Sequence, residues 1–251
     1  MLYRSELQSS MIAELRAGEL ELVSTSSAFN GFRLSTRIMA AHGAARGGDW
    51  CETFVLSDDV VALSIGDVCG HGAGAFEGML TTRQTVRDAA VGGLDPARTL
   101  ANVNRALYRE HRELYVTAIF GLLDTHRHTL TFANAGHPPP LMVGYFGEQL
   151  IEFGNGDLLL GMDAAAAPAL HVVKIPAQTL LVFYTDGVID YGRDAIAGQR
   201  KLRVAANLAY RYPALPAAPV IERQMFLPGS NDDDASILTA RTPALRMHAS
   251  R

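Results

Sequence analysis

Residues 60–74, with the sequence VVALSIGDVCGHGAG, join an apolar run to a cluster of three glycines. The run at residues 60–65 is typical of a β-strand, and Asp67 follows it. The glycines at positions 70, 72 and 74 favour a pliable turn. A helical pattern comes next, at residues 75–90. The stretch therefore predicts a strand, an aspartate after it, a turn and a helix.

Short strand-like runs recur along the rest of the chain. They cover residues 33–41, 53–56, 116–123, 129–133, 180–184 and 236–240. Their brevity and the turn residues between them predict sheets that are largely antiparallel. Strands, paired helices, strands, helices and a last strand follow one another in the order of an α+β protein.

Three further helical segments accompany the one at residues 75–90. The second helix has Asp95 as its N-cap and Pro96 at the first helical position, both of which are favoured there. A further pair is predicted at residues 195–210 and 218–226. The helices thus come in two sequential pairs.

Length and composition bound the domain organisation. A chain of 251 residues with 48% hydrophobic content suits one large core. We expect one domain at residues 21–241, after an amphipathic helix at residues 1–20 that leads into it or contacts a partner, and before a tail at residues 242–251.

Charge, cysteines and hydropathy indicate the environment. The net charge of −4 offers no basic surface for nucleic acid or acidic lipid. The two cysteines, Cys51 and Cys69, are too few for a disulfide framework. Since no stretch reaches about 18 apolar residues, we expect a soluble, cytoplasmic protein without nucleic-acid or membrane partners.

Aspartates lie near the ends of the predicted strands. They occur in GGDW at 47–50, IGDV at 65–68, YTDG at 184–187 and DDDA at 232–235. Taken singly, each is better explained as a turn residue, because Asp is favoured in turns. Carboxylates at the ends of neighbouring strands can also converge, and crowded like charges need a cation to neutralise them. A converged cluster would hold hard cations such as Mg²⁺ or Mn²⁺.

Five motifs, GGDW, GDVCGHG, NAGHPP, FYTDGV and DDASIL, occur in the order found in the SpoIIE-like branch of the PPM (type 2C) phosphatases. The chain resembles this branch from about residue 37 to residue 241. The resemblance implies a four-layer α-β-β-α sandwich, with two mainly antiparallel central sheets flanked by helix pairs. It also implies a protein serine/threonine phosphatase that uses two divalent cations, Mn²⁺ or Mg²⁺, and no other cofactor.

The resemblance assigns roles residue by residue. Asp67 resembles the aspartate that bridges both metals, and the backbone carbonyl of Val68 resembles the ligand that follows it. Asp186 and Asp233 resemble ligands of one metal, and Asp49 resembles the acidic residue that serves the other, directly or through water. The implied reaction is attack of a metal-bridging water on phosphorus, with Asp67 and Asp186 as catalytic residues.

Several residues near these motifs have other expected roles. Cys69 stands where the eukaryotic branch has a histidine that protonates the leaving oxygen, which leaves the general acid open. His71 suits a turn as well as a catalytic role, whereas the prolines after His137 indicate a structural residue. Glu52 is expected in the outer shell of the site or in solvent. Asp234 is expected to point away from Asp233, because side chains alternate along a strand.

Two functions remain open. In the first, the chain hydrolyses phosphoserine or phosphothreonine on a bacterial signalling protein of the anti-sigma-factor-antagonist type, under the control of a protein partner. In the second, it is a catalytically weak module that binds and switches a signalling partner. The intact acidic motifs favour the first.

Overall fold

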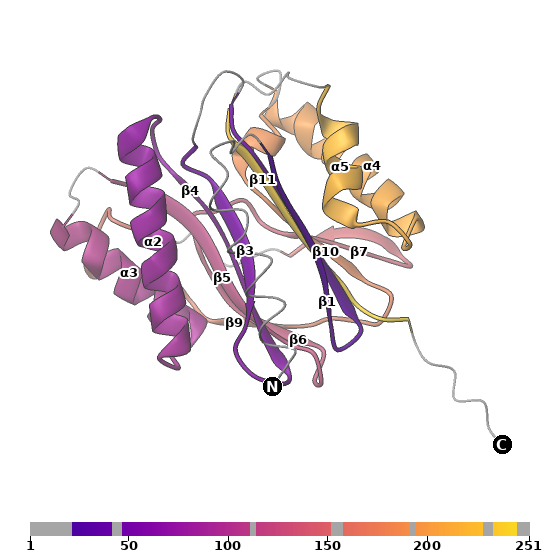
Figure 1. Cartoon of the computed structure of the whole chain (residues 1–251), viewed down its shortest axis with the longest axis horizontal. Helices are drawn as coiled ribbons and strands as arrows, with labels where there is room; N and C mark the ends of the chain where they lie inside the picture. Colours follow the sequence, from indigo (N-terminus) through magenta and orange to yellow (C-terminus); the bar gives the residue numbers. More distant parts are fainter. Residues whose placement is uncertain are drawn as a thin grey trace.

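We describe a computed structural model of the chain, covering residues 22–41, 47–110, 114–151, 158–190, 194–227 and 233–244. Two β-sheets pack face to face, and a helix pair covers the outer face of each (Figure 1). The predicted α-β-β-α sandwich is therefore confirmed. The predicted helix at residues 1–20 and all but the first residues of the predicted tail lie outside the described residues, so the domain bounds stay predictions.

The six-stranded sheet has the order β1-β2-β11-β10-β7-β8, with antiparallel pairing throughout. Its strands are β1 (Leu22–Phe29), β2 (Phe32–Met39), β7 (Leu141–Gly144), β8 (Gly147–Leu150), β10 (Leu180–Tyr184) and β11 (Ala235–Arg241). Its outer face is covered by helices α4 (Ala195–Arg211) and α5 (Ala217–Met225).

The five-stranded sheet has the order β3-β4-β5-β6-β9 and is also antiparallel. Its strands are β3 (Trp50–Val55), β4 (Val60–Val68), β5 (Val116–Asp124), β6 (Thr129–Ala135) and β9 (His171–Lys174). Helices α2 (Ala73–Val91) and α3 (Pro96–Glu110) cover its outer face.

Side-chain alternation decides which layer each residue enters. Along β3, Trp50 lies in the core beneath α2 and α3, whereas Cys51 lies in the core between the two sheets. The predicted start of α3 is confirmed, since Asp95 Oδ1 accepts a hydrogen bond of 2.9 Å from the Arg98 amide. The amide of Thr242, at the start of the predicted tail, donates to the Thr179 carbonyl at 2.9 Å, and Thr242 is buried.

All seven predicted strands and the four predicted helices within the described residues are present, with ends shifted by a few residues. Four strands were missed: the polar β1, and β7, β8 and β9, which have four residues each. One placement was wrong, because Asp67 lies within β4, paired with Thr117 of β5, rather than after the strand. Hydrogen bonding to β5 extends β4 beyond its apolar run.

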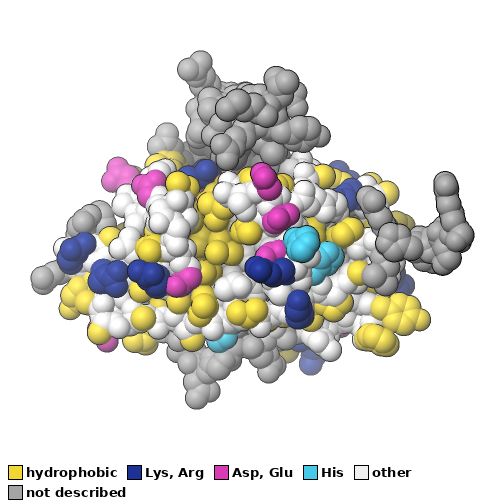
Figure 2. Space-filling view, turned by 90° about the horizontal axis from the view of Figure 1, so that it is seen from below, with side chains coloured by type: hydrophobic (Ala, Val, Ile, Leu, Met, Phe, Trp, Pro, Cys, Tyr) yellow, Lys and Arg dark blue, Asp and Glu magenta, His cyan; other side chains and the backbone are white. Residues whose placement is uncertain are grey.

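The surface of the described residues mixes charges. Seen from below in Figure 2, basic, acidic and histidine side chains are interspersed with apolar ones on that face. Within the described residues, no helix is long and apolar enough to cross a membrane.

Candidate metal centre

Both sheets contribute aspartates to one end of the sandwich. In the five-stranded sheet, Asp49 directly precedes β3 and Asp67 lies near the end of β4, and the two strand ends pair through Trp50 and Gly66. In the six-stranded sheet, Asp186 lies two residues after β10, in the short 3₁₀ helix Asp186–Val188. Antiparallel pairing therefore brings together, within a sheet, strand ends that are distant in sequence.

Alternation turns Asp49 and Asp67 toward the other sheet. Asp49 has the parity of Cys51, and Asp67 has the parity of Ile65, and both of these apolar residues lie in the core between the sheets. The two carboxyls therefore extend the line of that core at its end. Asp49 is buried and Asp67 is half-buried, whereas Asp186 and Asp233 are exposed at the rim.

The pKa values of three of these carboxyls are raised. Burial, followed by the charge of Asp186, raises the pKa of Asp67 to about 6, with smaller contributions from Asp233 and Asp234. Burial and the charge of Asp67 raise the pKa of Asp49 well above its ordinary value. The pKa of Asp186 is raised too, first because the surrounding protein partly shields its carboxyl from water although the residue is exposed at the rim. The side chains of both sheets thus share one electrostatic environment, in which negative charge is costly.

The donor chemistry of this cluster fits a hard cation. Carboxylate oxygens are the ligands that Mg²⁺ and Mn²⁺ prefer, and a cation would relieve the repulsion that raises these pKa values. Backbone approaches closely here, since a Cβ on Gly48 would lie 2.9 Å from the Val68 carbonyl oxygen. Among the described residues, no three acidic, histidine or cysteine side chains already surround one point at ligating distances. The cluster therefore fits a hard cation in its charge and in the type of its donor atoms, but its described side chains do not already surround a metal position.

Asp233 and Asp234 have different surroundings, as strand alternation predicts. The Asp234 carboxylate accepts 2.9 Å hydrogen bonds from the amides of Ala41 and Gly48, which flank residues outside the described set. A Cβ on Gly47 would lie 2.4 Å from this carboxylate. Asp234 therefore fastens the backbone before Asp49, while Oδ1 of Asp233 accepts from the Asp234 amide at 2.8 Å. Asp232 lies outside the described residues.

Sequence reasoning missed Thr185, which is fully buried and contacts Asp49. Its hydroxyl donates to Asp49 Oδ2 at 2.6 Å and accepts from the Ser236 amide at 2.8 Å. The only signal in the sequence was its place in the YTDG motif, directly before Asp186.

Cys69 and His71 lie on the segment that follows Asp67. The Cys69 amide donates to the Tyr115 carbonyl at 2.9 Å. Burial and the charge of Asp67 raise the pKa of the Cys69 thiol, which disfavours the nucleophilic thiolate. His71 is exposed, between Gly70 and Gly72, both of which have positive φ angles.

His137 has the structural surroundings that its prolines predict. Its amide donates to Asn134 Oδ1 at 2.8 Å, and Asn134 Nδ2 donates back to the His137 carbonyl at 2.9 Å. Its ring Nδ1 lies 2.8 Å from the Thr117 hydroxyl. Burial lowers its pKa to about 3, so the ring is neutral near pH 7.

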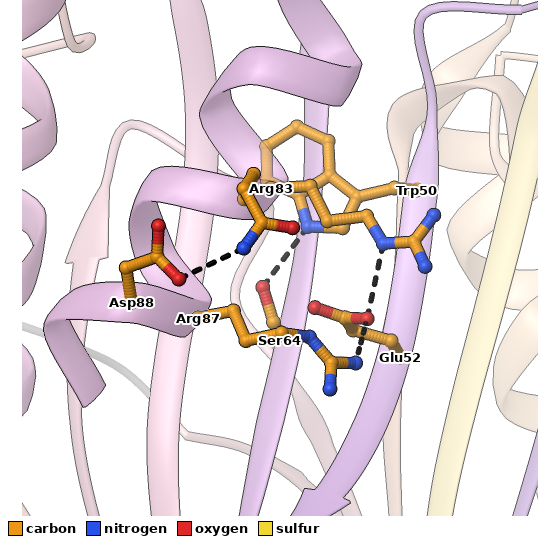
Figure 3. Close-up of polar contacts among 7 residues, drawn as sticks. Trp50, Glu52, Ser64, Arg83, Arg87 and Asp88 are labelled. Carbon is orange, nitrogen blue, oxygen red and sulfur yellow. Dashed lines mark hydrogen bonds and ion pairs between the residues drawn. The ribbon is translucent and has the colours of Figure 1, made fainter. Parts of the chain in front are cut away.

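Glu52 corrects an expectation, because it lies neither in solvent nor in the carboxylate cluster. It is buried and faces α2, where Arg83 Nε and Arg87 Nη2 lie 3.0 Å and 2.7 Å from its Oε2 (Figure 3). On the same side of β3, Trp50 Nε1 donates to the Ser64 hydroxyl at 2.9 Å. Alternation explains the difference, since Glu52 has the opposite parity to Asp49. Glu52 therefore fastens α2 to β3.

Comparisons with known sequences agree on one family. The model of the family described as stage II sporulation protein E (SpoIIE) matches residues 57–243. Protein IcfG of Synechocystis sp. is 28% identical over 171 residues, which cover 57% of this chain and 27% of IcfG. Phosphoserine phosphatase RsbP of Bacillus subtilis is 26% identical over 148 residues, 57% of this chain and 36% of RsbP. The chain thus spans about a quarter to a third of the length of these relatives.

Solved structures share the fold. The structure of the RsbU and RsbW domains of Rv1364c from Mycobacterium tuberculosis has a TM-score of 0.73 and 26% identity, over 90% of this chain and 63% of that one. The PP2C phosphatase domain of SpoIIE from Bacillus subtilis has a TM-score of 0.73 and 19% identity, over 93% and 74%. RsbX in complex with magnesium has a TM-score of 0.66 and 13% identity, over 87% and 98%. The last two show the fold alone.

Proposed function

Because the chain belongs to the family of stage II sporulation protein E, we propose that it is a metal-dependent phosphatase that hydrolyses phosphoserine or phosphothreonine in proteins. One observation carries the proposal: carboxyls from both sheets share one end of the sandwich, where burial and the charges of Asp186 and Asp233 raise the pKa of Asp67 on the other sheet. The printed name of RsbP, a phosphoserine phosphatase, supports the reaction class.

Two divalent cations, Mn²⁺ or Mg²⁺, would be held by Asp49, Asp67, the Val68 carbonyl, Asp186 and Asp233. When bound, the cations would neutralise phosphate charge and lower the pKa of water in the site. Asp67 and Asp186 would act as the catalytic residues, since they lie at the junction of the two sheets, where burial and the charge of Asp186 raise the pKa of Asp67.

The rest of the chain would support this site without covalent chemistry. Asp234 would hold the backbone beside Asp49 through the amides of Ala41 and Gly48. The raised thiol pKa of Cys69 disfavours a cysteine nucleophile. The leaving oxygen would take its proton from solvent or from another group of the site.

The substrate we propose is a bacterial signalling phosphoprotein of the anti-sigma-factor-antagonist type, and the site of action is the cytoplasm. The Rsb names of several relatives support this class of substrate. A protein partner would regulate the activity, acting through α2, which begins five residues after Val68.

Hydrolysis of an aryl phosphate by the purified chain tests the proposal. We expect turnover that requires Mn²⁺ or Mg²⁺ and is lost with excess EDTA. A Cys51→Ser, Cys69→Ser variant should retain it, and Asp58→Asn, a change at the exposed β3–β4 turn, is the matched control. Turnover in excess EDTA would contradict the mechanism. A folded protein that binds Mn²⁺ without turnover would favour the switching module instead.

A further inference from the structure

The candidate ligands come from two sheets, and within the described residues no backbone ladder joins these sheets. Asp67 lies in β4 of the five-stranded sheet and Asp49 directly before β3 of the same sheet, whereas Asp186 and Asp233 lie two residues after β10 and two residues before β11 of the six-stranded sheet. Sheets stacked face to face are about 10 Å apart and contact one another through side chains. Strand pairing therefore places the chain segments that carry the two aspartates of one sheet. The placement of these two aspartates relative to the two of the other sheet depends on specific side-chain contacts.

Thr185 provides such a contact. It is fully buried between β10 and Asp186, so it moves with the six-stranded sheet. Its amide donates to the Ser236 carbonyl at 3.1 Å, and its hydroxyl accepts from the Ser236 amide at 2.8 Å. The same hydroxyl donates to Asp49 Oδ2 at 2.6 Å, across to the five-stranded sheet.

The direction of this hydrogen bond follows from the donor count. A threonine hydroxyl has one proton and two lone pairs, and here a lone pair faces the Ser236 N–H. The single proton is therefore directed to Asp49, at a length typical of a hydrogen bond to a carboxylate. This contact engages Oδ2 of Asp49, and the Asp49 carboxyl also shares a hydrogen bond with the carboxyl of Asp67 within the five-stranded sheet.

A second link between the sheets acts on the backbone. Asp234 holds the amide of Gly48, which fixes the chain just before Asp49 but not the rotation of its carboxyl. Cys51 Sγ lies 3.7 Å and 3.6 Å from carbonyls of Arg37 and Ile237, which are weak contacts. Thr185 is thus the partner that contacts the Asp49 carboxyl itself from the six-stranded sheet, whereas Asp67 contacts it from within the five-stranded sheet.

We propose that Thr185 is a positioning residue of the metal centre, which orients Asp49 and links the two pairs of aspartates across the sheets. The inference rests on the proposed function, since it assigns Asp49 to a cation. Residues that hydrogen-bond to a metal ligand typically change metal affinity by about 10–100-fold when removed.

Titration calorimetry with Mn²⁺ on the metal-free protein tests this inference. We expect Thr185→Val to weaken Mn²⁺ binding about 10–100-fold and Thr185→Ser, which keeps the hydroxyl, to stay within about threefold. In aryl phosphate hydrolysis, the half-saturating Mn²⁺ concentration of Thr185→Val should rise by the same factor, while kcat at saturating Mn²⁺ should fall by less than about fivefold.

Thr239→Val is the matched control, because it removes another buried threonine hydroxyl from the six-stranded sheet, 2.7 Å from the Ser35 hydroxyl. It should lower the melting temperature and leave Mn²⁺ affinity within about twofold. If Thr185→Val does not fold by circular dichroism, Thr185→Ala serves as the second variant with the same expectation.

Mn²⁺ affinity of Thr185→Val within about threefold of the original would overturn the inference, as would an equal loss in Thr185→Ser. In both cases the original chain still binds Mn²⁺, so the proposed function would stand. An original chain that binds no divalent cation would overturn the proposed function together with this inference.

Discussion

Helices α2 and α4 occupy equivalent outer layers of the sandwich (Figure 1), yet they begin differently. The N-cap of α2 is Gly72, with a φ of 82° and no side-chain cap. The N-cap of α4 is Asp194, whose Oδ1 accepts from the Ala197 amide at 3.0 Å. At the far end of α4, Arg241 donates to the carbonyls of Ala209 and Tyr210. The ends of α4 are thus held by polar side chains, whereas the start of α2 depends on the glycine-rich segment after Asp67.

Each helix pair is also tied to its sheet by an ion pair. Glu52 of β3 binds Arg83 and Arg87 of α2, and Arg37 of β2 binds Glu222 of α5 at 2.5 Å. The first pair lies on a strand that begins directly after Asp49, and on a helix that follows Asp67. The comparison teaches that similar layers can differ in their coupling to a site: the chain joins α2 to Asp67, and ion pairs join α2 to the strand that follows Asp49, whereas the ion pair of α5 joins it to β2.

The largest loss of turnover is expected when Asp67 is replaced, and this test asks whether the five-stranded sheet provides the central metal ligand. Asp67→Asn should lower Mn²⁺-dependent turnover by more than about 100-fold, beyond the range seen when a residue that merely supports a ligand is removed. The folded fraction should not fall, because the change removes a crowded charge. Aryl phosphate hydrolysis at saturating Mn²⁺, with thermal melting alongside, measures both. Near-original turnover in Asp67→Asn would contradict the assignment.

The next test asks what the six-stranded half contributes. Asp233→Asn should lose most activity at saturating Mn²⁺, Asp234→Asn an intermediate amount, and Asp232→Asn little. Asp234→Asn should also destabilise the fold by about 1–3 kcal/mol, since an amide can accept only one of the two backbone hydrogen bonds at Ala41 and Gly48.

Turnover and melting of these three variants, purified side by side, decide the ligand at this motif. An inactive Asp234→Asn beside a normal Asp233→Asn would place the ligand one residue later. Normal activity in all three would leave Asp186 as the ligand that the six-stranded half contributes.

Two single substitutions, one in each ion pair, test the comparison between the two helix pairs. Glu52→Gln and Glu222→Gln should each destabilise the protein by about 1–3 kcal/mol, because the first leaves Arg83 and Arg87, and the second leaves Arg37, without a carboxylate. Only Glu52→Gln should also lower turnover, by about 3–10-fold, and speed hydrogen exchange across residues 68–90. Equal effects of the two variants on turnover would show that the α2 attachment has no special link to the site.

The smallest expected effect concerns pH in the metal-free protein. The folded chain holds the Asp67 proton up to about pH 6, above the ordinary value of 3.8, so it binds more protons than the unfolded chain between these values. Stability should therefore fall as the pH rises from about 4 to 6. Melting temperatures should drop by a few degrees over this window, and less in Asp67→Asn. Saturating Mn²⁺ should remove the drop, and an equal drop in Asp67→Asn would assign it to other groups.

The sequence by itself determined the elements that have strong local signals. The apolar run before Asp67, the Asp95 cap and the helical pairs were predictable because propensity and periodicity act over a few residues. The five ordered motifs were enough to predict the family and, through it, the sandwich fold. The polar β1 and the four-residue β7, β8 and β9 were missed, since their pairing depends on neighbouring strands rather than on their own pattern.

Only the tertiary structure decided how side chains of distant elements meet. It turned Glu52 toward Arg83 and Arg87 of α2, against the expectation, and it brought the Thr185 hydroxyl to Asp49 across the gap between the sheets. Strand alternation predicts which side of its own sheet a residue occupies, but not which element lies there. That partner is set by the stacking of the layers, which depends on contacts between residues more than a hundred positions apart in the chain.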